Sequence, residues 1–189
     1  MDRDFWKRLL SYTKANVTLD PATVHPILVV SEDGKSVRRA DALQDLPDTP
    51  ERFDARHCVL GSEGFTSGRH YWEVEVGNGK YWAVGVARES VRRKGWISPR
   101  PEEGIWAMGI HGSKAHCNVY RTFCTPSACL YMSESAKRIG ASLDYEVGQV
   151  AFLDADWKLL LFSFPQDSFN GERILPYFWV RGSPLRLCS

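Results

Sequence analysis

Residues 69–88 read RHYWEVEVGNGKYWAVGVAR, and this stretch decides the fold. Apolar and charged residues alternate in its first half, so Trp72, Val74 and Val76 share one face of an extended chain and two glutamates share the other. This alternation is typical of a strand with one buried face and one solvated face. The pair Asn78-Gly79 lies between the two halves, and an Asn-Gly pair between alternating segments predicts a β-hairpin.

Short segments with strand character continue on both sides of this stretch. Besides strands over 69–76 and 81–88, we predict strands over residues 27–30, 57–60, 105–111, 118–123, 138–144, 149–154, 158–164 and 174–181. Turn residues separate nearly all of them, for example the Asp33-Gly34 pair. No helix of core length interrupts the series. The sequence therefore predicts an all-β fold, a two-sheet antiparallel β-sandwich, and not a parallel α/β sheet.

The first fourteen residues follow a different pattern. Five residues recur at helical spacing, namely Phe5, Trp6, Leu9, Leu10 and Thr13. Acidic residues precede them and basic residues occupy the other face, which predicts one short amphipathic N-terminal helix over residues 1–14. Two roles stay open: an element packed on the sandwich, or the end of a longer helix or coiled coil of a parent protein.

Composition limits the classes of function. The 189 residues contain 24 Lys+Arg and 23 Asp+Glu, so no global field attracts nucleic acid or an anionic membrane. No apolar stretch approaches the roughly 20 residues that span a bilayer, and residues 1–8 lack the apolar segment of a signal peptide. We expect a single cytoplasmic domain that binds no nucleic acid and does not insert into a membrane.

The cysteines predict neither disulfides nor a metal site. They are odd in number: Cys58, Cys117, Cys124, Cys129 and Cys188. A chain of this size folds without covalent cross-links, so reduced thiols are expected. Structural zinc sites usually contain a ligand pair two to four residues apart, and no Cys-x-x-Cys pair occurs here.

No catalytic motif is present in the sequence. The nucleophile elbow, the phosphate-binding loop and the His-Glu-x-x-His motif are all missing. Glu73 and Glu75 could be read as an acid/base pair, but they belong to the exposed face of a strand. We therefore expect them to be solvated and not catalytic. A glycosidase could use two separated carboxylates such as Asp144 and Asp154, but a chain with 23 acids always offers such a pair. We expect no cofactor and no enzymatic activity from this domain.

Several motifs follow one another along the chain: Leu19-Asp20-Pro21, Glu51-Arg52-Phe53-Asp54, Val59-Leu60-Gly61, Gly68-Arg69-His70-Tyr71-Trp72-Glu73-Val74-Glu75-Val76, Trp82-Ala83-Val84-Gly85-Val86 and Leu143-Asp144-Tyr145-Glu146. In order and spacing they resemble the PRY-SPRY domain of tripartite-motif (TRIM) ubiquitin ligases and butyrophilins. The likeness covers nearly the whole chain. It implies a concanavalin-like jelly roll in which a PRY segment over residues 15–68 and a SPRY segment over residues 69–189 form one compact domain. Residues 151–154 depart from the family's pattern, because the family usually has Ser-Phe-Tyr-Asn there.

The resemblance also implies a function. PRY-SPRY domains bind a protein target through variable loops on a rigid scaffold. The expected role is substrate recognition in a TRIM-type E3 ubiquitin ligase, whose coiled coil would make the parent dimeric, or a role in innate immunity in the cytoplasmic tail of a butyrophilin. An alternative is an intracellular sensor of a small anionic, phosphorylated ligand. An enzyme built on a lectin-like sandwich is a third possibility, for which the sequence favours no carboxylate.

We predict the contact surface at Arg56, Ala83, Trp96, His111, Arg121 and Arg181. By resemblance, Ala83, Gly109 and His111 match positions where one ligase of the family binds antibody with an acid and two tryptophans, so antibody binding is not expected. Arg56, Ala83, Arg121 and Ser127 match a phosphoantigen pocket of a butyrophilin, beside Trp96. Two basic residues and the tryptophan remain there, but the family's histidines do not. Tryptophan and arginine are the types favoured at binding hot spots.

Overall fold

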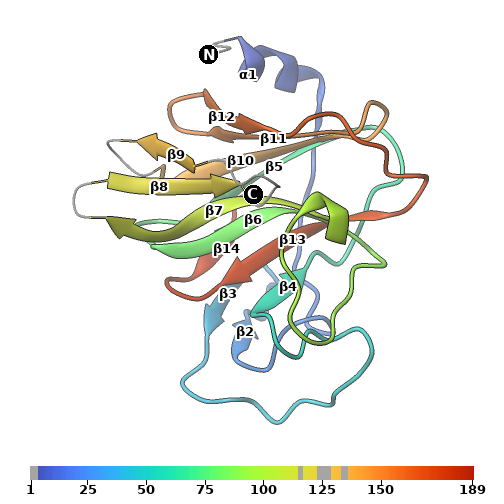
Figure 1. Ribbon diagram of the computed structural model, residues 1–189, viewed down its shortest axis with the longest axis vertical. Coiled ribbons are helices and arrows are strands. Elements are labelled where there is room, and N and C mark those ends of the chain that lie inside the picture. Colours follow the sequence, from blue (N-terminus) through green and yellow to red (C-terminus); the bar gives the residue numbers. More distant parts are fainter. Residues whose placement is uncertain (1–3, 115–116, 123–128, 133–135) are drawn as a thin grey trace.

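The chain folds into two β-sheets packed face to face, with a short N-terminal helix over one end of the larger sheet (Figure 1). The computed structural model describes residues 4–114, 117–122, 129–132 and 136–189, and their side chains except those of residues 111–122 and 129–132. Within these residues one sheet has eight strands and the other has six. The two-sheet sandwich predicted from the sequence is confirmed.

The larger sheet runs in the order β12-β11-β10-β5-β14-β3-β2, with β1 beside β5. Its strands are β1 Thr13–Lys14, β2 Leu28–Val30, β3 Ser36–Arg39, β5 Arg69–Glu75, β10 Arg138–Asp144, β11 Gln149–Asp154, β12 Leu159–Ser163 and β14 Leu185–Leu187. The smaller sheet runs in the order β4-β13-β6-β7-β8-β9. Its strands are β4 Cys58–Leu60, β6 Tyr81–Arg88, β7 Ile105–Lys114, β8 Cys117–Thr122, β9 Cys129–Met132 and β13 Ile174–Val180. Strands of residues 13–60 thus belong to both sheets.

The turn at Asn78-Gly79 does not form the predicted hairpin. β5 pairs with β10 and β14, whereas β6 pairs with β13 and β7, so the turn carries the chain from one sheet to the other. A type I′ hairpin needs positive φ at both central residues, but positive φ occurs here at Gly77 (56°) and at neither Asn78 nor Gly79. The amides of Val76 and Gly77 both donate to the carbonyl of Lys137, which ties the turn to the start of β10.

Two other predicted turns are confirmed. β2 and β3 form an antiparallel hairpin, and Gly34 in its turn has a φ of 70°. β10 and β11 form another, in which Asp144 pairs with Gln149. The hairpin therefore survives the departure from the family's pattern at residues 151–154. Strands β1, β3, β9 and β14 were not predicted, because each is short and lacks a full period of alternation.

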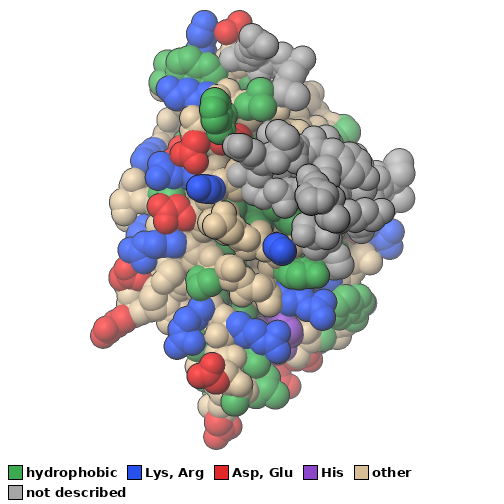
Figure 2. All heavy atoms as spheres, turned by 90° about the vertical axis from the view of Figure 1, so that its left-hand side faces the viewer, with side chains coloured by type: hydrophobic (Ala, Val, Ile, Leu, Met, Phe, Trp, Pro, Cys, Tyr) green, Lys and Arg blue, Asp and Glu red, His purple; other side chains and the backbone are tan. Residues whose placement is uncertain are grey.

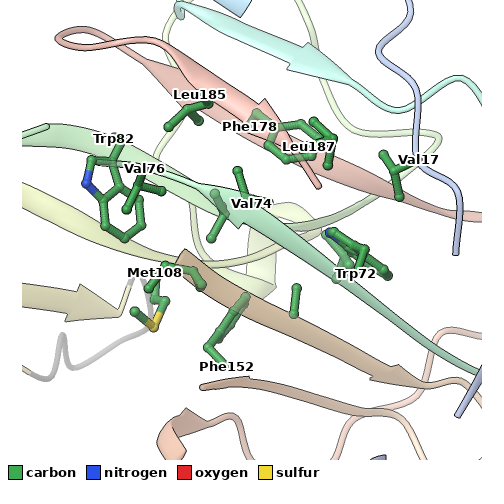
Figure 3. Packing of buried hydrophobic residues seen from close by; sticks show 14 of the residues in the cluster. Val17, Trp72, Val74, Val76, Trp82, Met108, Phe152, Phe178, Leu185 and Leu187 are labelled. Atoms are coloured by element: carbon green, nitrogen blue, oxygen red, sulfur yellow. The ribbon is translucent and has the colours of Figure 1, made fainter. Parts of the chain in front are cut away.

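The core between the sheets contains the residues that the alternation assigned to it. Figure 3 shows Val74 and Val76 of β5 among the core side chains, with Trp72 farther along the strand and Trp82 on the opposing strand. Trp72, Trp82 and Trp106 are each 1% exposed, so all three are structural core residues. Burial of each such side chain stabilises the fold by about 1.5–3 kcal/mol or more.

The N-terminal helix is shorter than predicted. α1 covers Phe5–Arg8, a 3₁₀ turn follows at Leu9–Ser11, and a second 3₁₀ turn lies at Pro101–Glu103. Tyr12 is extended, and β1 then pairs in parallel with His70 and Tyr71 of β5, so strand pairing ends the helix. Phe5 is buried against Ala151 and Leu153 of β11, so the helix packs on the sandwich.

Among the described residues, Cys58 and Cys188 carry free thiols; the thiols of Cys117, Cys124 and Cys129 lie outside the described side chains. No cluster of metal-ligating side chains occurs in the described part of the chain. None of its described helices has the length and apolar character needed to cross a membrane.

Candidate functional site

A row of neighbouring residues crosses the outer face of the smaller sheet. By strand register, Trp179 pairs with Ala83, Ala83 with Gly109, and Gly109 with Arg121. Since Trp82 points into the sandwich core, Ala83 and its row belong to the opposite, outer face. Ala83 has a small side chain and Gly109 has none, so little side-chain volume covers the sheet between Trp179 and position 121.

Arg56 lies at one end of this row, just before β4. Its guanidinium carbon is 4.7 Å from the centroid of the Trp96 ring and 5.7 Å from that of Trp179, which are cation–π distances. Arg56 is only 8% exposed, and it takes part in no ion pair among the described residues. The site therefore contains a buried positive charge that two aromatic faces stabilise and that no carboxylate of the described residues neutralises.

Trp96 projects into solvent from a loop that is held in place. Its side chain is 69% exposed. The preceding residues are bonded to another loop: Lys94 Nζ donates to Asp48 Oδ1 (2.6 Å), Arg93 donates to the carbonyl of Glu51 (2.9 Å), and the amide of Gly95 donates to Asp54 Oδ1 (2.8 Å). Two loops that are distant in sequence thus fix the position of one exposed aromatic ring.

Two further predicted site residues, Ala83 and Arg181, belong to the region where β6 and β13 pair. Ala83 is buried and contributes by its small size. Arg181 is exposed just after β13, and its amide donates to the carbonyl of Tyr81 (3.2 Å). Tyr81 pairs with His111 in the backbone register. The side chains of His111 and Arg121, and residue Ser127 as a whole, lie outside what the structure describes. The structure therefore brings Arg56, Trp96 and Ala83 together around Trp179.

Trp179 is buried, but it does not lie between the sheets. Phe178 and Val180 belong to the cluster between the sheets, whereas Tyr177 and Trp179 belong to a second cluster on the outer face of the smaller sheet. The alternation along β13 contains this signal, because a strand that buries residues 178 and 180 directs residue 179 to the other face.

Three titratable groups near Arg56, those of Cys58, Tyr177 and His57, are neutral at pH 7. Burial raises the pKa of the Cys58 thiol to about 11 and raises that of the Tyr177 hydroxyl, and the two groups are hydrogen-bonded at 3.2 Å. Burial also lowers the pKa of His57 to about 4, and the nearby charges of His25, Arg39, Arg181 and Arg56 act in the same direction. The described site thus combines cations, neutral polar groups and aromatic rings, a composition suited to binding.

The two carboxylates considered for glycosidase chemistry are placed far apart. Asp144 pairs with Gln149 at one end of the β10–β11 hairpin, and Asp154 pairs with Ile139 at the other. Five residues of strand separate them by about 17 Å, beyond the reach of paired glycosidase carboxylates. Asp144 forms an ion pair with Arg69 (3.1 Å), and Asp154 accepts bonds from the amides of Asp156 and Trp157. Both have structural roles.

Comparison with known proteins assigns the family. A family model for the SPRY domain matches residues 69–188, and a model for PRY, the SPRY-associated domain, matches residues 17–65. Butyrophilin subfamily 1 member A1 of Mus musculus is 45% identical over 179 residues, which are 93% of this chain and 33% of that protein. E3 ubiquitin-protein ligase TRIM58 of Mus musculus is 42% identical over 174 residues, which are 92% of this chain and 35% of that protein.

Solved structures agree on the fold. The crystal structure of the TRIM65 PSpry domain superposes with a TM-score of 0.79 at 22% identity, covering 98% of this chain and 95% of that one. A structure of stonustoxin gives a TM-score of 0.72 at 26% identity, covering 93% of this chain and 29% of that one. The chain spans about a third of the length of the curated relatives above. It belongs to the PRY-SPRY family, the protein-interaction domain shared by butyrophilins and TRIM proteins.

Proposed function

We propose that this domain is the target-recognition module of an intracellular TRIM-type ubiquitin ligase or butyrophilin that acts in innate immunity. It binds a protein through a surface formed by Arg56, Ala83, Trp96, His111, Arg121 and Arg181. One observation carries the proposal: Trp96, 69% exposed, lies over Arg56 on a loop fixed by three side-chain bonds. In a TRIM parent, a preceding coiled coil would present two such surfaces.

The physical argument concerns the cost of binding. Ordering a flexible loop on association costs free energy, and a pre-organised loop avoids that cost. Exposed tryptophan is rare on a stable fold and is the residue type most favoured at the centre of interfaces. Figure 2 shows the end of the molecule where β6 begins and β13 ends, with Lys and Arg side chains around a histidine.

The test uses the full-length parent in cells. Proteins that co-purify with the wild type are quantified against the variants Trp96→Ala and Trp157→Ala. Trp157 is a matched control, because it is 76% exposed and lies in the turn before β12, in the other sheet. We expect Trp96→Ala to deplete the specific partner at least tenfold (~1.4 kcal/mol) and Trp157→Ala to retain it. Equal retention by both variants would show that the site is elsewhere.

A second candidate function is the binding of a small anionic, phosphorylated ligand. The observation that favours it is the buried guanidinium of Arg56, which pairs with no carboxylate among the described residues. Calorimetry of the domain against phosphorylated metabolites tests it. Heat that disappears in Arg56→Gln supports this function, and no heat at millimolar ligand rules it out.

A further inference from the structure

A second surface adjoins the candidate site on its PRY side. It is an open groove of about 550 Å³, which we call the His57 groove. Its lining residues are His25, Pro26, Ile27, Arg39, Leu43, Gln44, Asp54 and His57. His57 directly follows Arg56 in the chain, so the groove begins where the candidate site ends.

Backbone and side-chain hydrogen bonds fix the walls of the groove. Gln44 Nε2 donates to the carbonyls of Leu28 (2.6 Å) and Pro26 (3.2 Å), which holds the loop after β3 against the segment that enters β2. The His25 ring accepts the amide of Ile27 at Nδ1 (3.0 Å), so its Nε2 carries the proton donated to the carbonyl of Asp54 (3.0 Å). These groups are satisfied, and the groove is preformed.

Three lining groups remain available to a ligand. The His57 ring lies 4.7 Å from the His25 ring and makes no hydrogen bond among the described residues. Arg39 is exposed and forms no ion pair there either. Leu43 is 70% exposed on the rim. The groove thus offers an imidazole, a guanidinium and an apolar side chain side by side.

Arginine side chains surround His57 in the groove. Burial lowers the pKa of His57 to about 4, and the positive charges of Arg39, Arg181 and Arg56 act in the same direction. Asp54 is the one carboxylate lining the groove, and its Oδ1 already accepts the amide of Gly95. A negatively charged ligand would be attracted by the guanidinium of Arg39 in the lining and, at longer range, by Arg56 and Arg181, and Asp54 would oppose it.

We propose that the His57 groove binds an acidic segment of the partner protein, with an Asp or Glu carboxylate bonded to Arg39 and His57 and an apolar neighbour packed on Leu43. The carboxylate matches the planar donors of the guanidinium. The apolar rim favours a peptide over a free anion. The proposal rests on the proposed function in taking the ligand to be a protein, and it adds the chemistry of the segment that is recognised.

The test uses a capped hexaglutamate peptide, with capped hexaglutamine as its uncharged match at constant ionic strength. We expect hexaglutamate alone to shift the ring resonances of His57 and to raise its pKa by about 1 or more, as an opposite charge within a few ångströms does. Arg39→Gln should weaken binding of fluorescent hexaglutamate at pH 7 at least tenfold. Arg38→Gln is the matched control, because Arg38 is also exposed on β3 but precedes Arg39 and so faces the other side of the sheet.

Three outcomes would overturn the proposal. In the first, hexaglutamate leaves His57 unchanged. In the second, Arg38→Gln weakens binding as much as Arg39→Gln. In the third, inorganic phosphate at equal charge shifts His57 as strongly as the peptide, which would assign the groove to small anions. Loss of the cellular partner in Trp96→Ala together with its retention in Arg39→Gln would refute this inference and leave the proposed function intact.

Discussion

Arg56 lies beneath Trp96, with 4.7 Å between its guanidinium carbon and the centroid of the indole ring. The relationship joins a residue before β4 to a loop that follows β6, so it connects the PRY and SPRY parts of the chain. It also explains how an arginine that is 8% exposed is tolerated without a carboxylate among the described residues. The electron-rich face of the ring offsets part of the cost of removing the charge from water.

This pair should be energetically coupled. In a double-mutant cycle with Arg56→Met and Trp96→Ala, we expect a coupling of about 0.5–2 kcal/mol in the free energy of unfolding. Urea titration of the four proteins measures it. The Lys158–Trp6 pair, at 4.5 Å, has an exposed lysine and is a control cycle that should give a coupling at the low end of this range. A coupling of zero for Arg56 and Trp96 would mean that their contact contributes nothing to stability.

The bond from Gly95 to Asp54 should control the order of the Trp96 loop. Asp54→Ala removes the acceptor at 2.8 Å, so the amide of Gly95 should exchange with solvent at least tenfold faster, which corresponds to about 1.4 kcal/mol. Hydrogen exchange followed by NMR measures this rate. Asp48→Ala, which cuts the exposed ion pair to Lys94, should have a smaller effect. Unchanged exchange at Gly95 in Asp54→Ala would contradict the role given to this bond.

The domain should lose stability as the pH falls from about 6.5 toward 4. The folded domain keeps His57 neutral down to about pH 4, whereas the unfolded chain takes up this proton near 6.5. Stability is therefore fully present above pH 6.5 and declines below it. Burial also lowers the pKa of His25, which adds to the slope. Because His57 is partly exposed, its share is reduced by screening to roughly 1 kcal/mol.

Urea midpoints at several pH values between 4.5 and 7.5 measure this slope. His57→Gln removes the titrating group and should flatten the slope relative to the wild type. Parallel slopes for the two proteins would show that the pKa of His57 is not lowered in the folded state.

Cys58 should be chemically inert in the folded domain. Its thiol is buried and its pKa is raised to about 11, so little thiolate exists at neutral pH. Iodoacetamide at pH 7.5 should leave Cys58 unmodified for as long as the domain remains folded and should modify it rapidly in urea. Peptide mass spectrometry follows both reactions. Fast labelling of Cys58 without denaturant would mean that β4 opens readily.

The sequence predicted the faces of the strands better than their partners. Alternation around Trp72 assigned the buried side chains correctly, because each residue of a strand must point to one face or the other. Pairing is not encoded in this way. Asn78-Gly79 is compatible with a hairpin, but β10 and β14 pair with β5 and thereby bury its apolar face against the other sheet. The long-range pairs overrode the local turn.

The candidate site was predicted in its residue types and only partly in its arrangement. Trp96 and Arg56 were predicted as contact residues by family resemblance, but no local pattern indicates that one stacks on the other. Their contact depends on the bonds between two loops, such as Gly95 to Asp54. The His57 groove was not predicted, because its lining comes from four segments that are separate in sequence.

The sequence by itself thus determined that this chain is an all-β sandwich, which residues lie in its core, and which family it resembles. These properties follow from periodicity and from ordered motifs, which are local along the chain. Only the tertiary structure decided that β5 and β6 belong to different sheets, that Arg56 contacts two tryptophan rings, and that His57 and Arg39 line one groove. Such contacts depend on pairing between strands that are distant in sequence. That pairing is favoured because it buries the apolar faces of both sheets against each other.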